Sequence, residues 1–142
     1  MILVTAATEI EMNPLLDQLQ RSSLSFLHLV TGVGLTQTAQ RLTHFLCENS
    51  SPIEGIVNFG VGGGFFSPAK KANEPQVLDI CVAEREVFGD LGICMGDKVD
   101  YLPEDLVGQV TFELKNPLTH RCIEILGDAE IEYRKGVFIS VN

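Results

Sequence analysis

Two carboxylates follow the first apolar run of the chain and could act on a bound substrate. Glu9 follows the segment ILVTAAT directly, and Glu11 lies two residues further along. A carboxylate in a crevice can serve as a general base towards water when its pKa is held near the working range. Acidic residues also suit a helix N-terminus, where they complement the helix dipole and accept hydrogen bonds from free N–H groups. The pattern of residues by itself favours the second role, and both roles stay open.

A glycine-rich turn follows the third apolar segment, in the sequence GIVNFGVGGGFF at positions 55–66. Glycine is used where φ must be positive or where the backbone must lie close to another group. The run therefore indicates either a tight structural turn or a backbone that approaches a ligand.

The known nucleotide-binding and nucleophile motifs do not account for this turn. Gly60 and Gly62 fit the start of a GxGxxG fingerprint, but Phe65 stands at the third glycine position. The turn also follows the third apolar segment, whereas the fingerprint belongs after the first strand of its unit. The sequence contains neither the GKS or GKT of a P-loop nor a GxSxG nucleophile elbow. The cysteines and histidines show no metal-ligand spacing, so we expect no metal and no cofactor.

The composition is that of a soluble globular domain, which we expect to span residues 1–142. The chain is 45% hydrophobic and 20% charged, with a net charge of −9. Scattered basic residues and a negative charge argue against nucleic-acid binding. No apolar run reaches the ~20 residues of a membrane span, and the N-terminus lacks a signal-peptide layout. We therefore predict a cytoplasmic protein with no membrane partner and with buried free thiols at Cys47, Cys81, Cys94 and Cys122.

Apolar segments alternate with helical patterns along the chain. Strands are expected within residues 1–7, 23–34, 53–60, 76–89 and 135–142, and helices within 8–21, 35–50 and 118–127. Thr8 and Glu11 have the spacing of a capping box, and Pro14 is expected in the first turn of the first helix. This alternation predicts an α/β fold with a mainly parallel sheet.

Three conspicuous turns would meet at one edge of that sheet. They are AATEIE, TGVG and GVGGG, each following one of the first three predicted strands. Ligands of open α/β sheets bind at the carboxyl ends of the strands. The convergence of the turns therefore predicts a small-molecule site.

Four segments together resemble one enzyme family. ILVTAATEIEMNPL, LVTGVGLTQTAQRL, GIVNFGVGGGF and LDICVAEREVFGD resemble, in order and spacing, motifs of the methylthioadenosine/adenosylhomocysteine nucleosidases in the purine nucleoside phosphorylase superfamily. FGVGGGF and AEREVFGDLG are most similar to the futalosine hydrolase branch, purine N-ribosyl hydrolases of menaquinone biosynthesis. The resemblance implies a three-layer αβα sandwich with a mainly parallel mixed sheet.

The resemblance also implies roles for individual residues. Glu11 falls on the glutamate that positions and activates the attacking water. Residues beside the nucleoside fall on the three turns, at Ala7, Thr8, Val33, Gly34, Val61, Gly62 and Gly63. Val61 stands where the adenosine-type nucleosidases have a serine, so that side-chain contact differs here.

The chain also departs from the family in its length. Family members are longer and carry a Met-Glu sugar-binding motif and a Ser-Asp motif whose aspartate protonates the leaving base; neither motif occurs here. We therefore expect an N-terminal portion of a nucleosidase domain, truncated at its C-terminus and inefficient as a catalyst by itself. An exposed strand edge would favour a homodimer or another homo-oligomer.

Three functions are consistent with the sequence. The first is a purine nucleoside hydrolase of the futalosine hydrolase type or, as a variant, a methylthioadenosine/adenosylhomocysteine nucleosidase. The second is a phosphorylase of the same fold, which would use phosphate in place of water. The third is a non-catalytic nucleoside-binding or vestigial domain. The glycine turns carry no Arg or Lys to hold phosphate, which favours water over phosphate.

Overall fold

The apolar run at the N-terminus forms the central strand of a three-stranded parallel sheet. In the computed structural model, which describes residues 1–19, 25–65 and 74–141, β1 (Ile2–Ala6) lies between β2 (Leu27–Val30) and β3 (Gly55–Asn58). Leu3 stands opposite Leu27 on one side and Ile56 on the other. Since parallel strands are covered on both faces, the central strand is the most apolar of the three. Its position follows from the run ILVTA.

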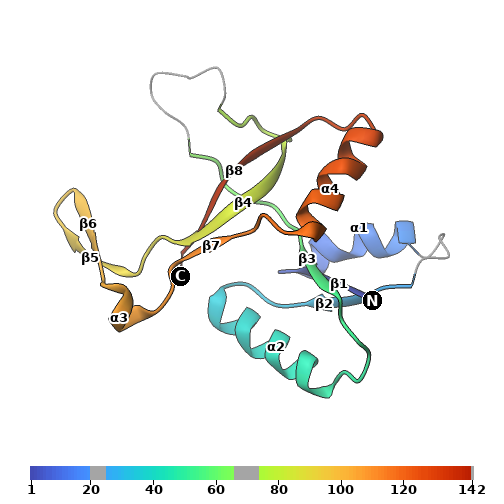
Figure 1. Ribbon diagram of the computed structural model, residues 1–142, viewed down its shortest axis with the longest axis horizontal. Helices are drawn as coiled ribbons and strands as arrows, with labels where there is room; N and C mark the ends of the chain where they lie inside the picture. The colour runs from blue at the N-terminus through green and yellow to red at the C-terminus, as the bar shows by residue number, and fades with distance from the viewer. Residues whose placement is uncertain (20–24, 66–73, 142) are drawn as a thin grey trace. The chain divides into compact units, whose positions relative to one another are not determined.

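Two helices connect these strands. α1 (Glu9–Leu19) leads from β1 to β2, and α2 (Leu35–Glu48) leads from β2 to β3. The two crossovers run in opposite directions along the sheet, so their right-handedness places the helices on opposite faces. Figure 1 shows α1 on one side of the strands and α2 on the other.

The buried core of this part lies between β1 and α1. Leu3, Ala6 and Met12 are fully buried, and Thr5 and Thr31 are buried polar residues. Pro14 lies inside α1 rather than in its first turn, so that prediction was wrong. Proline lacks an N–H, and the helix continues through it without that one backbone hydrogen bond.

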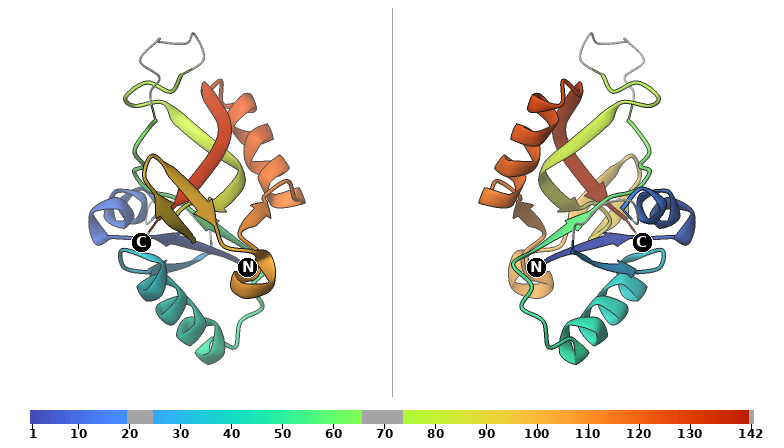
Figure 2. Two further views of the ribbon diagram at one scale, coloured as in Figure 1. Left: turned by 90° about the vertical axis from the view of Figure 1, so that its left-hand side faces the viewer. Right: turned by 90° about the vertical axis from the view of Figure 1, so that its right-hand side faces the viewer.

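A second sheet forms in the C-terminal half of the chain. β4 (Ile80–Phe88) pairs in parallel with β8 (Tyr133–Ser140) and antiparallel with β7 (Thr111–Glu113). Figure 2 shows β4 and β8 side by side and strongly twisted. α4 (Pro117–Asp128) joins β7 to β8. Its start is defined by Asn116, whose side chain accepts a hydrogen bond from the Thr119 N–H, and by Pro117 in the first turn.

The segment between β4 and β7 contains elements that the sequence pattern did not predict. β5 (Gly92–Met95) and β6 (Lys98–Tyr101) form an antiparallel hairpin, and α3 (Glu104–Val107) is a single short turn. Every residue of β6 is exposed, so the segment lacks the alternation that marks a half-buried strand.

The chain divides into two compact units, Met1–Gly62 and Gly63–Asn142, each described here by itself. Helices and parallel strand pairs occur in both, which confirms the α/β class. No helix in the described part of the chain is long and apolar enough to cross a membrane. All four cysteines are free, but Cys47, Cys81 and Cys94 are exposed and Cys122 is half-buried. The prediction that all four are buried was therefore wrong.

Candidate active site

The first turn of α1 is closed by a reciprocal pair of hydrogen bonds. The Glu11 backbone N–H donates to Thr8 Oγ1 at 3.3 Å, and the Thr8 N–H donates to Glu11 Oε2 at 3.0 Å. The Thr8 hydroxyl also donates to Glu11 Oε2, at 2.8 Å. These contacts confirm the predicted capping box. They orient the Glu11 carboxylate along the loop that follows β1.

The second oxygen of the same carboxylate is bound by the glycine-rich turn after β3. The Val61 N–H donates to Glu11 Oε1 at 3.0 Å. A Cβ atom on Gly60 would lie 2.7 Å from Glu11 Oε1, so a side chain at this position would displace the Glu11 carboxylate. Gly60 also has no positive φ. The close approach of the backbone to Glu11 therefore explains the first glycine of the turn.

These hydrogen bonds lower the pKa of Glu11 below the usual 4.5. The largest cause is the backbone N–H of Val61, followed by the Thr8 hydroxyl, and partial burial opposes them. Hydrogen bonds to the charged form of a carboxylate favour that form. Glu11 is therefore ionised at neutral pH and carries a fixed negative charge at this edge of the sheet.

The loop after β2 is hydrogen-bonded to the loop after β1. The Thr31 N–H donates to the Ala6 carbonyl at 2.9 Å, and the Gly32 N–H donates to the Ala7 carbonyl at 3.0 Å. The buried Thr31 hydroxyl also donates to the Ala6 carbonyl, at 3.2 Å. Gly32 has a φ of 85°, a conformation that favours glycine. The turn TGVG thus needs its first glycine for backbone reasons.

The ends of β1 and β3 are joined in the same way. The Phe59 N–H donates to the Thr5 carbonyl at 3.0 Å, and the Thr5 hydroxyl donates to Asn58 Oδ1 at 3.0 Å. Thr5 is only 3% exposed. Its hydroxyl therefore finds its partner within the sheet, and the three strand ends form one hydrogen-bonded edge.

This edge brings together some of the predicted site residues but not all of them. Hydrogen bonds link Ala7 to the loop after β2, and Thr8 and Val61 to Glu11. Val33 is 72% exposed. The remaining predicted residues are Gly34, Gly62 and Gly63. At each of them, no atom lies within 4 Å of the position that a Cβ atom would take. The Val61 N–H already donates a hydrogen bond to Glu11. A ligand beside this turn would therefore contact other backbone groups of the turn.

Gly60, Thr5, Thr31 and Asn58 complete the edge, and sequence reasoning did not assign them to it. Gly60 could have been singled out as the glycine nearest the end of the strand. The two threonines stand among apolar residues, and no local pattern distinguishes a structural hydroxyl from a functional one there.

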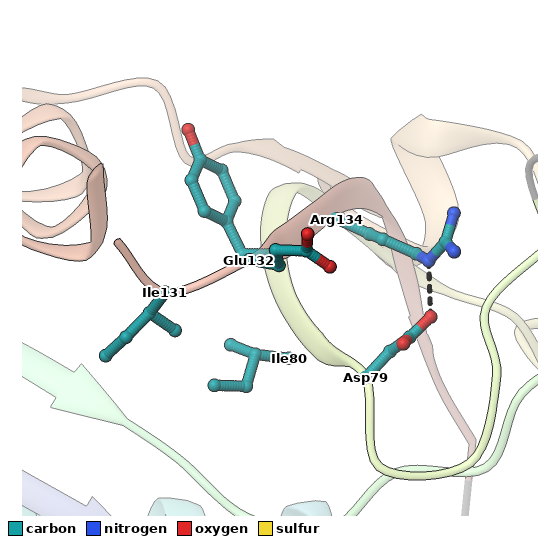
Figure 3. A pocket seen from close by; sticks show the side chains of 6 residues that line it. Asp79, Ile80, Ile131, Glu132 and Arg134 are labelled. Atoms are coloured by element: carbon teal, nitrogen blue, oxygen red, sulfur yellow. Dashed lines mark hydrogen bonds and ion pairs between the residues drawn. The ribbon is translucent and has the colours of Figure 1, made fainter. Parts of the chain in front are cut away.

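A separate hollow lies within the second unit, at the amino ends of β4 and β8. It measures about 510 Å³ and is lined by Asp79, Ile80, Ile131, Glu132, Tyr133 and Arg134. Figure 3 shows Arg134 turned towards Asp79, and its Nε donates to Asp79 Oδ2. The Gln76 N–H donates to the same oxygen at 2.8 Å, and it is the first cause that lowers the pKa of Asp79. This carboxylate is already satisfied, and none of the predicted site residues lies in the hollow.

Within the described residues, no group of three or more histidine, cysteine or acidic side chains is placed to hold a metal ion. The described side chains at the strand edge are the ionised Glu11 carboxylate, the hydroxyls of Thr5, Thr8 and Thr31, and the Asn58 amide, together with backbone groups. Such a set can orient a water molecule or a sugar hydroxyl and can stabilise positive charge nearby.

No protein-family model and no curated protein matches the sequence. Solved structures do match it. A mutant futalosine hydrolase of Helicobacter pylori strain 26695 has a TM-score of 0.76 at 17% identity, over 99% of this chain and 64% of that chain. The D198N mutant of Helicobacter pylori MTAN, with 5′-methylthioadenosine in its active site, has a TM-score of 0.72 at 18% identity, with the same coverage. Campylobacter jejuni 5′-methylthioadenosine/S-adenosyl homocysteine nucleosidase has a TM-score of 0.69 at 16% identity, again over 99% of this chain and 64% of that chain.

These similarities confirm the predicted resemblance at the level of the fold. The chain has the fold of the methylthioadenosine nucleosidases and futalosine hydrolase over nearly its whole length. It spans 64% of the length of these solved chains, as expected for a resemblance that covers part of a longer domain.

Proposed function

We propose that the chain is the Glu11-bearing part of a purine nucleoside N-ribosyl hydrolase, with futalosine as its substrate. The single observation that carries this proposal is the ionised Glu11 carboxylate, bound by Thr8 on one oxygen and by Val61 on the other. It lies at the carboxyl ends of parallel strands, where ligands of α/β sheets bind. The likeness in fold to nucleosidases supports the choice of reaction.

The chemistry of N-glycoside cleavage fits a fixed carboxylate. The C–N bond to the base breaks through an oxocarbenium-like sugar while water attacks the anomeric carbon. A negative charge beside the sugar stabilises that cation, and electrostatic stabilisation of this kind is a large term in catalysis. Glu11 Oε1 accepts the Val61 N–H and has a second lone pair that can orient the attacking water.

Water is favoured over phosphate as the nucleophile. The short turns AATEIE, TGVG and GVGGG, which directly follow β1, β2 and β3, contain no Arg or Lys. The nearest basic residue along α2, Arg41, donates from Nη1 to the Val30 carbonyl at 3.2 Å. A phosphorylase needs cationic or hydroxyl groups around its phosphate, so hydrolysis stays the leading proposal.

Protonation of the leaving purine needs a further group. The resemblance assigns it to a Ser-Asp motif, which the sequence does not contain. General acid catalysis contributes about 10²–10⁴-fold. We therefore propose that these 142 residues bind the nucleoside but hydrolyse it poorly by themselves. The complete protein would act in the cytoplasm, in menaquinone biosynthesis, as a homodimer or other homo-oligomer.

The experiment begins with the reading frame beyond the codon for Asn142 and the intact mass of the natural protein. The encoded polypeptide is then assayed for hypoxanthine released from futalosine and for adenine released from methylthioadenosine. We expect hypoxanthine release that falls at least ~100-fold in Glu11→Gln, while the exposed neighbour Glu9→Gln changes little. Release of adenine alone would replace futalosine by methylthioadenosine as the substrate. Nucleoside binding without release of either base would favour the non-catalytic alternative.

A further inference from the structure

The two strands of the hairpin β5–β6 pair with each other along their inner edges, and within the described residues the outer edge of each strand is open. Within the described residues, no other strand pairs with β6. The hairpin is nevertheless rich in exposed apolar side chains, since Ile93 is 57%, Met95 62% and Tyr101 60% exposed. An isolated two-stranded hairpin is at best marginally stable in water. A third strand on the open edge of β6 would therefore stabilise it.

The pairing pattern defines which backbone groups lie on that open edge. Gly96 and Asp97 form a two-residue turn, with a φ of 70° at Gly96, as in a type II′ hairpin. Met95 and Lys98 then form the closing hydrogen-bonded pair. The Leu102 N–H donates to the Leu91 carbonyl at 3.0 Å, which is consistent with the same alternation at the far end.

Hydrogen-bonded pairs alternate with non-bonded pairs in an antiparallel ladder. The residues between the bonded pairs, Val99 and Tyr101, consequently point their N–H and C=O groups away from β5. β6 thus presents two sets of backbone donors and acceptors to an incoming strand.

The charges of β6 are self-complementary about Val99, with a positive residue before it and a negative residue after it. Lys98 and Asp100 flank Val99 on either side. We propose that β6 pairs antiparallel with β6 of a second copy of this chain, across a twofold axis at Val99. Val99 then faces the partner's Val99 as a hydrogen-bonded pair. Lys98 faces the partner's Asp100 in a non-bonded pair, where cross-strand side chains are closest.

Twofold axes at the two charged residues of the same strand are unfavourable. An axis at Lys98 would oppose two lysines, and an axis at Asp100 would oppose two aspartates. Like charges directly opposite each other destabilise a sheet. Only the axis at Val99 gives two identical Lys–Asp pairs, as an isologous twofold interface requires. This surface is argued independently of the nucleosidase activity and gives the proposed self-association a defined location.

Charge-reversal variants of the full chain test the pairing through sedimentation velocity over a range of concentrations. Lys98→Asp places aspartate opposite aspartate, and Asp100→Lys places lysine opposite lysine. We expect each to weaken dimerisation about tenfold or more, because two attractive pairs become repulsive. An equimolar mixture of the two variants should dimerise again, since each lysine then meets an aspartate of the other chain.

Two controls make the result decisive. Lys115→Asp changes the net charge as Lys98→Asp does, but on an exposed residue outside the hairpin, and should dimerise like the parent chain. Circular dichroism checks that each variant is folded. A parent chain that stays monomeric, single variants that dimerise as the parent does, or a mixture that stays monomeric would each overturn the proposal. Hypoxanthine release is measured separately, so loss of activity is not mistaken for loss of pairing.

Discussion

The Val61 N–H and the Glu11 carboxylate are joined by a 3.0 Å hydrogen bond between residues 50 positions apart. This bond connects the glycine-rich turn after β3 to the first turn of α1. It has two consequences. It fixes the direction of the one carboxylate that we assign to catalysis. It also fixes the path of the turn, whose backbone at Gly60 passes so close to Glu11 that an added Cβ atom would lie 2.7 Å from Oε1.

The first prediction concerns the pH dependence of stability. The pKa of Glu11 is lowered in the folded chain relative to 4.5, so the unfolded chain binds the proton more readily. The carboxylate therefore contributes stability above about pH 4.5, and this contribution is lost as the pH falls through the folded pKa. In urea unfolding, Glu11→Gln should be less stable than the parent by about 1 kcal/mol at neutral pH.

The pH profile distinguishes this effect from a general loss of packing. The difference between the parent and Glu11→Gln should shrink as the pH falls below 4.5, because the protonated carboxyl then resembles the amide. Glu9→Gln removes the same charge from an exposed position of the same turn and should show a much smaller difference. A difference for Glu11→Gln that stays constant from neutral to acid pH would contradict the assignment.

The second prediction concerns the glycines of the turn. Gly60→Ala should lower the free energy of unfolding by about 1 kcal/mol, since its Cβ atom displaces Glu11 Oε1 and breaks the bond to Val61. Gly62→Ala is the matched control, because nothing lies within 4 Å of its added Cβ atom. Alanine there should be neutral or slightly stabilising through the unfolded chain. Equal effects of the two substitutions would mean that Gly60 is not needed for the approach to Glu11.

The third prediction concerns the capping box. Thr8→Ala removes the hydroxyl that both accepts from the Glu11 N–H and donates to its carboxylate. It should cost about 1 kcal/mol of stability and lower hypoxanthine release by the complete protein. Thr8→Ser keeps the hydroxyl and should restore most of both. A serine variant as impaired as the alanine variant would indicate that the threonine methyl group, rather than the hydroxyl, is what matters.

Much of the α/β framework could be predicted from local patterns. The run ILVTA, the Thr8–Glu11 spacing and the apolar positions of α2 each act over a few residues, and each forms the expected element. The hairpin β5–β6 was missed because its side chains are exposed on both faces, so no alternation marks it. The position of Pro14 was predicted wrongly because tertiary packing of the helix outweighs the cost of one lost backbone hydrogen bond. Met12, two residues earlier in the same helix, is fully buried.

The candidate site was only partly predictable for a related reason. Glu11 and Thr8 are three residues apart, and their contact follows from helix geometry. The contact of Glu11 with Val61 depends on how β3 lies beside β1, which periodicity does not specify. The sequence marks these glycines as unusual, but only the structure shows why glycine is used at each position. Gly60 approaches Glu11, and Gly32 has a positive φ.

The fourth prediction concerns the end of α4. The Ile131 N–H donates to the Leu126 carbonyl at 2.9 Å, and the Glu130 N–H donates to the Gly127 carbonyl at 3.0 Å. This is the bond pattern of a Schellman motif, whose left-handed position is normally glycine. Here Glu130 occupies it with a φ of 54°, which is costly for a residue with a Cβ atom.

Glu130→Gly should therefore raise the free energy of unfolding by about 0.5–1 kcal/mol, measured by urea denaturation. Glu130→Gln removes the charge but keeps the Cβ atom, so it should not reproduce the gain. Asp128→Gly, at the last residue of α4, places glycine in helical backbone and should lower stability instead. If Glu130→Gly were no more stable than Glu130→Gln, the left-handed backbone at this position would not be a source of strain, and the end of α4 would owe its geometry to the contacts of Ile131.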